Sequence, residues 1–238
     1  MQLPQGMAYG WWHFDVPSVR DLSFRIQIAG DTNRLPGRYL QLYQGKIAGV
    51  GFYLGFQTDT LRPDIGWQGH GLIFSRWGSR DSGDARIGQG GWIENAGHEG
   101  GFVGVRATFA WFPGEYRCDL RPSENDSFGV WYEFTVKHAE KTVSAGSLRF
   151  PTSKIESGGG SWTEVYSAAR NETEVPLTEL RIIQLAGNDG TVRPIRCDTT
   201  YNDRFASSDA FFDGGSLVLR SGGTTRRKHE PRQYALHP

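Results

Sequence analysis

The sequence predicts an all-β protein that folds as a two-sheet antiparallel β-sandwich, of the jelly-roll, concanavalin-like or lectin-like type. Three observations lead to this class. Glycine accounts for 32 of the 238 residues and aromatic residues for 13%, whereas only 22% are charged, a mixture that suits short strands and tight turns. Runs in which apolar and polar residues alternate recur along the chain. Turn-forming stretches such as 188–190 and 213–215 separate these runs.

The alternating runs predict strands along most of the chain. In order, they are residues 22–28, 39–43, 50–59, 71–77, 102–111, 115–121, 128–137, 143–150, 180–185, 191–198 and 216–220. Residues 161–171 approach the length of a helix, but their Trp, Thr and Val content makes the helix a weak candidate. We expect one domain over residues 1–223, because a chain of this length can bury a core without staples. The polar residues 224–238 are expected to form a flexible tail.

The alternation also predicts which side chains point away from the core. In residues 50–59, Phe52, Leu54 and Phe56 share the inward face. The candidate ligand-binding residues are polar or aromatic side chains assigned to outward faces: Gln57, Asp59, Trp77, Arg106, Arg117, Trp131 and Glu133. Aromatic rings stack on sugar C–H surfaces and planar polar groups bind pairs of hydroxyls, so this set favours a polysaccharide or oligosaccharide ligand. A solvated sheet with cross-strand Arg–carboxylate pairs explains the same pattern.

A second candidate feature is the stretch His98-Glu99-Gly100-Gly101. Glu99 could act as a general acid or base, with His98 and Arg106 tuning its pKa. The alternative is structural, because a Glu beside two glycines can cap a turn through nearby backbone N–H groups. His98 and Glu99 are therefore catalytic candidates only if the protein is an enzyme.

Several short motifs occur in a recognisable order: residues 10–17 (GWWHFDVP), 51–59 (GFYLGFQTD), 73–77 (IFSRW), 98–101 (HEGG), 111–117 (WFPGEYR), 148–151 (LRFP) and 211–215 (FFDGG). Their order resembles a family of mostly secreted bacterial, lectin-like jelly-roll proteins that is known only as a domain of unknown function. The resemblance extends to about residue 223. It implies the fold and a polysaccharide context, and it supplies no catalytic residue.

Three functions remain open from the sequence. The first is carbohydrate recognition by the outward face. The second is a polysaccharide-cleaving enzyme on the same face, either a glycoside hydrolase, which needs two carboxyls, or a lyase, for which Gln57, His98, Arg106 and Arg117 could supply the groups. The sequence motifs of lectin-fold β-glucanases and alginate lyases are both absent. The third is a protein-interaction module.

The remaining expectations concern metals, thiols and partners. Asp81 and Asp84 could join Asp59 or backbone carbonyls in a calcium site, but the spacing of an EF-hand is absent and a solvated loop is the favoured explanation. Cys118 falls on an inward position, and a disulfide to Cys197 stays open because sequence separation gives no geometry. A formal net charge of zero disfavours nucleic acid, and no apolar run approaches the roughly 20 residues that span a membrane. The start lacks a secretory signal, which leaves a cytoplasmic protein or a secreted or periplasmic one whose signal has been removed.

Overall fold

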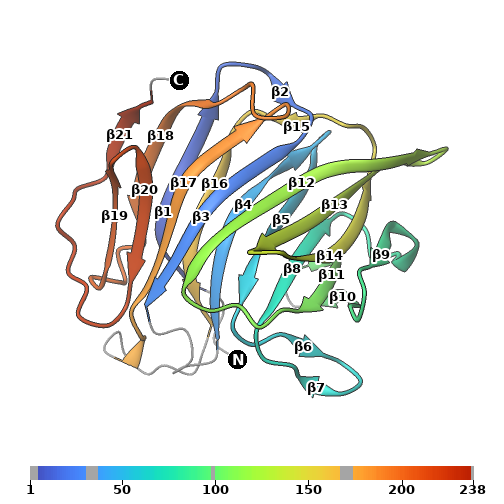
Figure 1. Cartoon of the computed structure of the whole chain (residues 1–238), viewed down its shortest axis with the longest axis horizontal. Coiled ribbons are helices and arrows are strands. Elements are labelled where there is room, and N and C mark those ends of the chain that lie inside the picture. Colours follow the sequence, from blue (N-terminus) through green and yellow to red (C-terminus); the bar gives the residue numbers. More distant parts are fainter. Residues whose placement is uncertain (1–4, 31–36, 98–99, 167–173, 237–238) are drawn as a thin grey trace.

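The computed structural model describes residues 5–30, 37–97, 100–166 and 174–236 (Figure 1). Over these residues the chain forms antiparallel strands and short 3-10 turns, with no α-helix. The strands make two sheets that stack face to face, so the expected two-sheet antiparallel β-sandwich is confirmed. Within the described part of the chain, no helix has the length and apolar character needed to cross a membrane.

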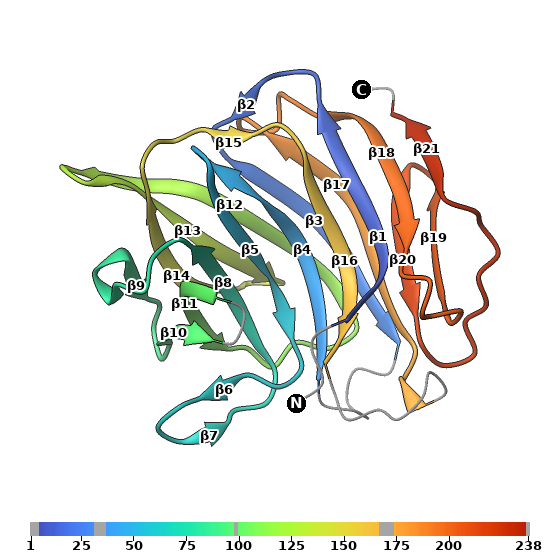
Figure 2. The same ribbon diagram turned by 180° about the vertical axis from the view of Figure 1, so that it is seen from behind.

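The larger sheet, sheet A, faces the viewer in Figure 2. Its strands in spatial order are β10 (Trp92–Gly97), β11 (Gly100–Thr108), β8 (Gly71–Trp77), β5 (Val50–Gln57), β4 (Arg38–Ile47), β16 (Gly159–Val165), β1 (Gln5–Phe14), β18 (Pro194–Tyr201) and β21 (Arg232–Ala235). The short strands β2 (Ser18–Val19) and β15 (Ile155–Glu156) extend it beside β4. Sheet A is thus assembled from both ends of the chain.

The smaller sheet, sheet B, lies in front in Figure 1. Its order is β19 (Ser208–Asp213), β20 (Ser216–Ser221), β17 (Thr178–Gly187), β3 (Leu22–Gly30), β12 (Gly114–Asp126), β13 (Gly129–His138), β14 (Lys141–Phe150) and β9 (Ala85–Ile87). A separate hairpin, β6 (Leu61–Arg62) and β7 (Gly66–Trp67), and the 3-10 turn η1 (Ser82–Asp84) lie in the connections.

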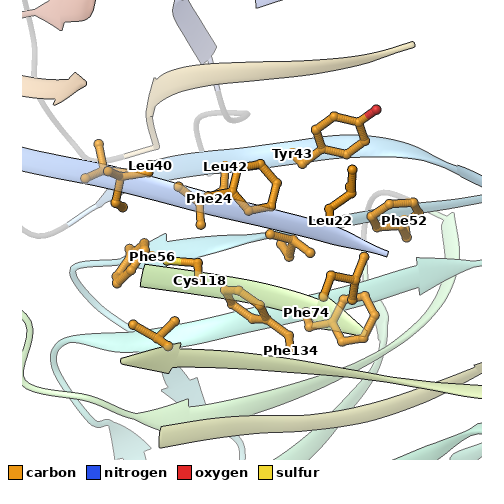
Figure 3. Packing of buried hydrophobic residues seen from close by; sticks show 14 of the residues in the cluster. Leu22, Phe24, Leu40, Leu42, Tyr43, Phe52, Phe56, Phe74, Cys118 and Phe134 are labelled. Carbon is orange, nitrogen blue, oxygen red and sulfur yellow. The ribbon is translucent and has the colours of Figure 1, made fainter. Parts of the chain in front are cut away.

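The core fills the space between the two sheets (Figure 3). Phe52 and Phe74 from sheet A meet Phe134 and Phe150 from sheet B, with neighbouring ring centroids 6.0 to 6.4 Å apart. Each such side chain, when fully buried, contributes roughly 1.5–3 kcal/mol. The inward positions expected for residues 50–59 are therefore occupied as the alternation predicts.

Both cysteines are free and buried. Cys118 comes from β12 and Cys197 from β18, so one thiol lies in each sheet. Burial raises the pKa of both thiols, which leaves them protonated and unreactive.

Two segments differ from the expectation. Residues 159–165, which overlap the weak helix candidate, form strand β16 between β1 and β4. The expected flexible tail instead supplies β21, which pairs with β18 through residues 232–235. A polar sequence suffices there because an edge strand needs only its backbone groups to complete the ladder. The segment before β21 is also held, since His229 Nδ1 lies 3.0 Å from Asp209 Oδ2.

Candidate ligand-binding face

Two clusters of aromatic rings lie on the outer face of sheet A. The first, ring cluster 1, consists of Tyr9 and Trp11 from β1 and Trp162 from β16. Tyr9 and Trp11 are stacked at 5.7 Å with an interplanar angle of 9°, and Trp162 lies 5.7 and 6.1 Å from them. These residues alternate with buried ones, such as Trp12, that point into the core.

Ring cluster 2 consists of Tyr39 from β4, Tyr53 from β5 and Trp77 from β8. The Tyr53 and Trp77 rings are 4.9 Å apart, and Tyr39 and Tyr53 are 5.9 Å apart. Tyr53 stands between Phe52 and Leu54, which both point into the core, so its ring is on the outer side. Strand β4 separates the two clusters over most of the face.

Glycines give these rings their positions. A Cβ atom on Gly160 would lie 2.6 Å from Trp11 Cζ3, and one on Gly51 would lie 3.1 Å from Trp77 Cε3. A Cβ atom on Gly55 would come as close as 3.0 Å to the Tyr39 ring. The rings therefore lie against backbone where a side chain would hold them away.

Two glutamine side chains lie between the ring clusters. Gln41 is opposite Trp162 on one side and Gly55 on the other, while Gln44 is opposite Gly160 and Tyr53. Both reach the same face although they are three residues apart, because the register of β4 shifts between Gln41 and Tyr43. Gln41 is only 2% exposed, and its Nε2 has no hydrogen-bond partner among the described residues.

Acidic and phenolic groups gather at the end of the face where β4 begins. Glu164 is opposite Tyr39, and its Oε2 accepts a 2.8 Å hydrogen bond from Trp162 Nε1. Burial, and then the negative charge of Glu164, raises the pKa of Tyr9. Gln57 belongs here too, since it is opposite Tyr39, and Tyr166 Oη donates a 3.2 Å hydrogen bond to the backbone carbonyl of Asp59 just after it.

A groove of about 590 Å³ lies at the other end of the face. Five of its lining residues are glycines, and the larger side chains that line it are Trp11, Gln44, Lys46, Trp77 and Glu156. Glu156 Oε1 accepts a 2.6 Å hydrogen bond from the backbone N–H of Gly49. Few large side chains therefore line the groove, and it is bordered by one positively charged residue, Lys46, and one negatively charged residue, Glu156.

The structure divides the residues proposed from the sequence between two faces. Gln57 and Trp77 lie on the outer face of sheet A, and Asp59 follows β5 at its end, where burial raises the pKa of its carboxyl. Arg106 is also in sheet A, but it is 4% exposed and its Nε lies 3.1 Å from Glu94 Oε2. Its donors are therefore used within the sheet.

The other three proposed residues belong to sheet B. Arg117 pairs with Asp119 at 3.2 Å, and Glu133 accepts a 2.6 Å hydrogen bond from Ser144. Trp131 is 2% exposed, because the Arg86 guanidinium lies 3.8 Å from its ring centroid. These residues face away from sheet A, so they cannot share one ligand with Gln57 and Trp77.

The remaining candidates have separate outcomes. His98 and Glu99 lie outside the described residues. Asp81 caps the 3-10 turn through a 2.8 Å hydrogen bond from Gly83 N, and Asp84 pairs with Arg149 at 2.7 Å. Over the residues that the structure describes, no group of three His, Cys, Asp or Glu side chains is placed to hold a metal ion.

Several residues of the face were missed by the sequence reasoning: Tyr9, Trp11, Tyr39, Gln41, Gln44, Trp162 and Glu164. A signal existed for four of them, since Tyr9-x-Trp11 and Trp162-x-Glu164 each alternate with small or apolar residues. The first pair is part of a stretch that also carries a motif of the family resemblance, and the second lies in residues 161–171, whose length approaches that of a helix, so the alternation is less evident there.

No protein-family model matches the chain, and no curated protein matches it. Among solved structures, it is similar to scytalido-glutamic peptidase with a transition state analog inhibitor, at 10% identity and a TM-score of 0.47. A second structure of that peptidase, with a peptide-based analog, gives 8% and 0.47. SCP-B, a member of the Eqolisin family of peptidases in complex with the tripeptide Ala-Ile-His, gives 9% and 0.40. Each alignment covers 92% of this chain and 100% of the other.

These similar structures are peptidases, and none is a carbohydrate-binding protein. The expectations of carbohydrate recognition, of polysaccharide cleavage and of a polysaccharide or oligosaccharide partner are therefore wrong. The aromatic and planar polar groups that suggested a sugar are equally suited to other ligands, which is the physical reason that the pattern misled.

Proposed function

We propose that the outer face of sheet A binds a polypeptide segment in an extended conformation. The observation that carries the proposal is the pair of aromatic clusters with glutamine amides between them. The partly exposed amide of Gln44 offers two N–H donors and one carbonyl acceptor, the groups with which a peptide bond pairs, whereas Gln41 is only 2% exposed. The flat rings offer apolar surface for the side chains of such a segment.

The spacing of the face suits an extended chain. Trp162 of ring cluster 1 lies on β16 and Tyr53 of ring cluster 2 lies on β5, and these strands are two inter-strand steps apart, about 10 Å. An extended peptide rises roughly 3.3 Å per residue, so about three residues cover that distance.

The test is selection of short random peptides on the immobilised protein, followed by affinity measurement with the Trp162→Ala and Gln44→Ala variants. We expect selected peptides to lose at least about tenfold in affinity to either variant, because rings and amides in the centre of a contact carry most of its energy. Arg117→Ala, on the opposite face, is the matched control and should bind normally. Failure to select any peptide, or equal loss in the control, contradicts the proposal.

A second candidate is hydrolysis of the bound peptide. It is favoured by Gln41 Nε2, which has no hydrogen-bond partner in the described part of the chain and belongs to the strand next to Glu164. Diagonal neighbours on paired strands are about 7–8 Å apart, so the two side chains belong to the same small region of the face. Glu164 would accept a proton from the water, and Gln41 would donate a hydrogen bond to the oxygen that becomes negative.

Mass spectrometry of peptides after incubation separates the two candidates. Fragments that carry added water, and that disappear with Glu164→Gln while binding persists, support hydrolysis. Binding without fragments leaves the face as a recognition surface.

A further inference from the structure

Arg38 is a charged side chain buried in the interior of the sandwich. It begins β4 and is 1% exposed. Its Nη2 donates a 2.7 Å hydrogen bond to Ser221 Oγ at the end of β20, and its Nη1 lies 3.9 Å from Met7 Sδ. Its Nε has no hydrogen-bond partner among the described residues.

The guanidinium group stays positively charged in this position. Burial lowers the pKa of Arg38 to about 10, which still keeps the group protonated at neutral pH. A guanidinium group has five N–H donors, and here one strong acceptor and one weak one are in contact with it. Buried charges are normally paired, because removal from water without a partner is unfavourable.

Two other buried arginines of this protein are each paired with a carboxylate, unlike Arg38. Arg106 has Glu94 at 3.1 Å, and Arg76 has Asp84 at 3.5 Å. Within the described ranges, no carboxylate pairs with Arg38. Among these residues its charge is therefore not compensated by a negative group.

We propose that Arg38 is the centre of a buried anion site that takes chloride. The surrounding groups favour a small monovalent anion, because Met7, Val165 and Val175 form an apolar cluster on this side of the core and disfavour a larger, divalent and strongly hydrated anion such as sulfate. The Ser221 hydroxyl can donate its own hydrogen to the ion while its oxygen accepts from Arg38. A second buried hydroxyl, Thr225 Oγ1, lies in the turn after Ser221 and has no partner among the described residues.

The site is distinct from the peptide-binding face. Tyr39, the next residue, points to the outer side of sheet A, whereas Arg38 points inward. Failure of the peptide proposal would therefore leave the anion site unaffected.

Thermal unfolding at constant ionic strength tests the proposal, with chloride replaced stepwise by methanesulfonate. An anion that binds only the folded protein raises the melting temperature with its concentration, and we expect a rise of about 2–4 °C for the natural sequence. Arg38→Met keeps the length of the side chain without its charge and should lose this dependence. Arg25→Met, a substitution of an exposed arginine in β3, should keep it.

Crystals of the natural protein grown in bromide give a direct measurement that does not depend on any variant. An anomalous peak within hydrogen-bond distance of the Arg38 guanidinium is expected. Absence of this peak, or a melting temperature equal in chloride and methanesulfonate, overturns the proposal. If Arg38→Met does not fold, the bromide peak alone decides.

Discussion

The two outer faces of the sandwich are built from different chemistry. On sheet B, arginines and carboxylates pair with one another across strands: Arg25 with Glu115 at 3.3 Å, Arg220 with Glu179 at 2.6 Å and Arg181 with Asp213 at 2.9 Å. On sheet A, rings lie over glycines and glutamine amides stand between them. A face whose charges are already matched has little to offer a ligand, whereas the other face presents apolar surface and amide groups.

The largest expected effect contrasts two tryptophans. Trp131→Ala should lower the free energy of unfolding by about 3–5 kcal/mol, because this ring is enclosed on sheet B, and should leave peptide binding intact. Trp11→Ala should cost less than about 1 kcal/mol, since the ring is 36% exposed, yet reduce peptide affinity at least tenfold. Urea denaturation and calorimetric titration measure both quantities. Similar behaviour of the two variants would abolish the distinction between the faces.

Asp84 gives a pH-dependent test at the edge of sheet B. Burial acts to raise the pKa of Asp84, but hydrogen bonds from Ser79 and Arg149 and the charge of Arg76 outweigh it, so the pKa lies below its usual 3.8. A lowered folded-state pKa means that the carboxylate stabilises the fold above the unfolded pKa, and that this is lost as pH falls through the folded value.

Asp84→Asn should therefore cost about 2 kcal/mol at neutral pH and progressively less in acid. Denaturation curves at several pH values check this, with Asp213→Asn as a control whose carboxylate is exposed. A difference between the natural protein and Asp84→Asn that does not change with pH contradicts the assignment.

Gly160→Val tests whether the glycine beneath Trp11 in ring cluster 1 is needed for peptide binding. Its Cβ would stand 2.6 Å from Trp11 Cζ3, so the ring must move, and we expect peptide affinity to fall about tenfold, or roughly 1.4 kcal/mol. Gly101→Ala is the control, because a Cβ there meets its nearest atom at 3.4 Å. Unchanged affinity for Gly160→Val would mean that the ring position is unimportant.

The smallest effect is expected on the surface of sheet B. Arg25→Ala removes an exposed ion pair with Glu115, and such pairs contribute about 0–1 kcal/mol. Stability should change by no more than about 0.5 kcal/mol and peptide affinity should not change. A loss of binding here would show that sheet B takes part in recognition.

The sequence predicted the fold well because the strands alternate. Phe52, Leu54 and Phe56 are buried as expected, and so is Cys118. Alternation reports only whether a side chain points inward or outward, however. It does not say to which sheet a strand belongs, and so Gln57 and Trp131 were grouped although they lie on opposite sides of the molecule.

The candidate face depends on a β-bulge in β4, which cannot be recognised from the alternation of apolar and polar residues. The extra residue in β4 changes which positions point outward, so Gln41 and Gln44 share a face only once the register shift is known. The burial of Trp131 also escaped prediction, because Arg86, whose guanidinium covers the ring, comes from β9, far away in the sequence.

The two buried thiols allow local opening of the sandwich to be measured by cysteine labelling. Neither Cys118 nor Cys197 can meet an alkylating reagent until the strand around it opens, and the two belong to different sheets. Labelling rates measured separately at the two sites would tell whether the sheets loosen together or one before the other. A peptide held on sheet A should slow the labelling of Cys197 more than that of Cys118.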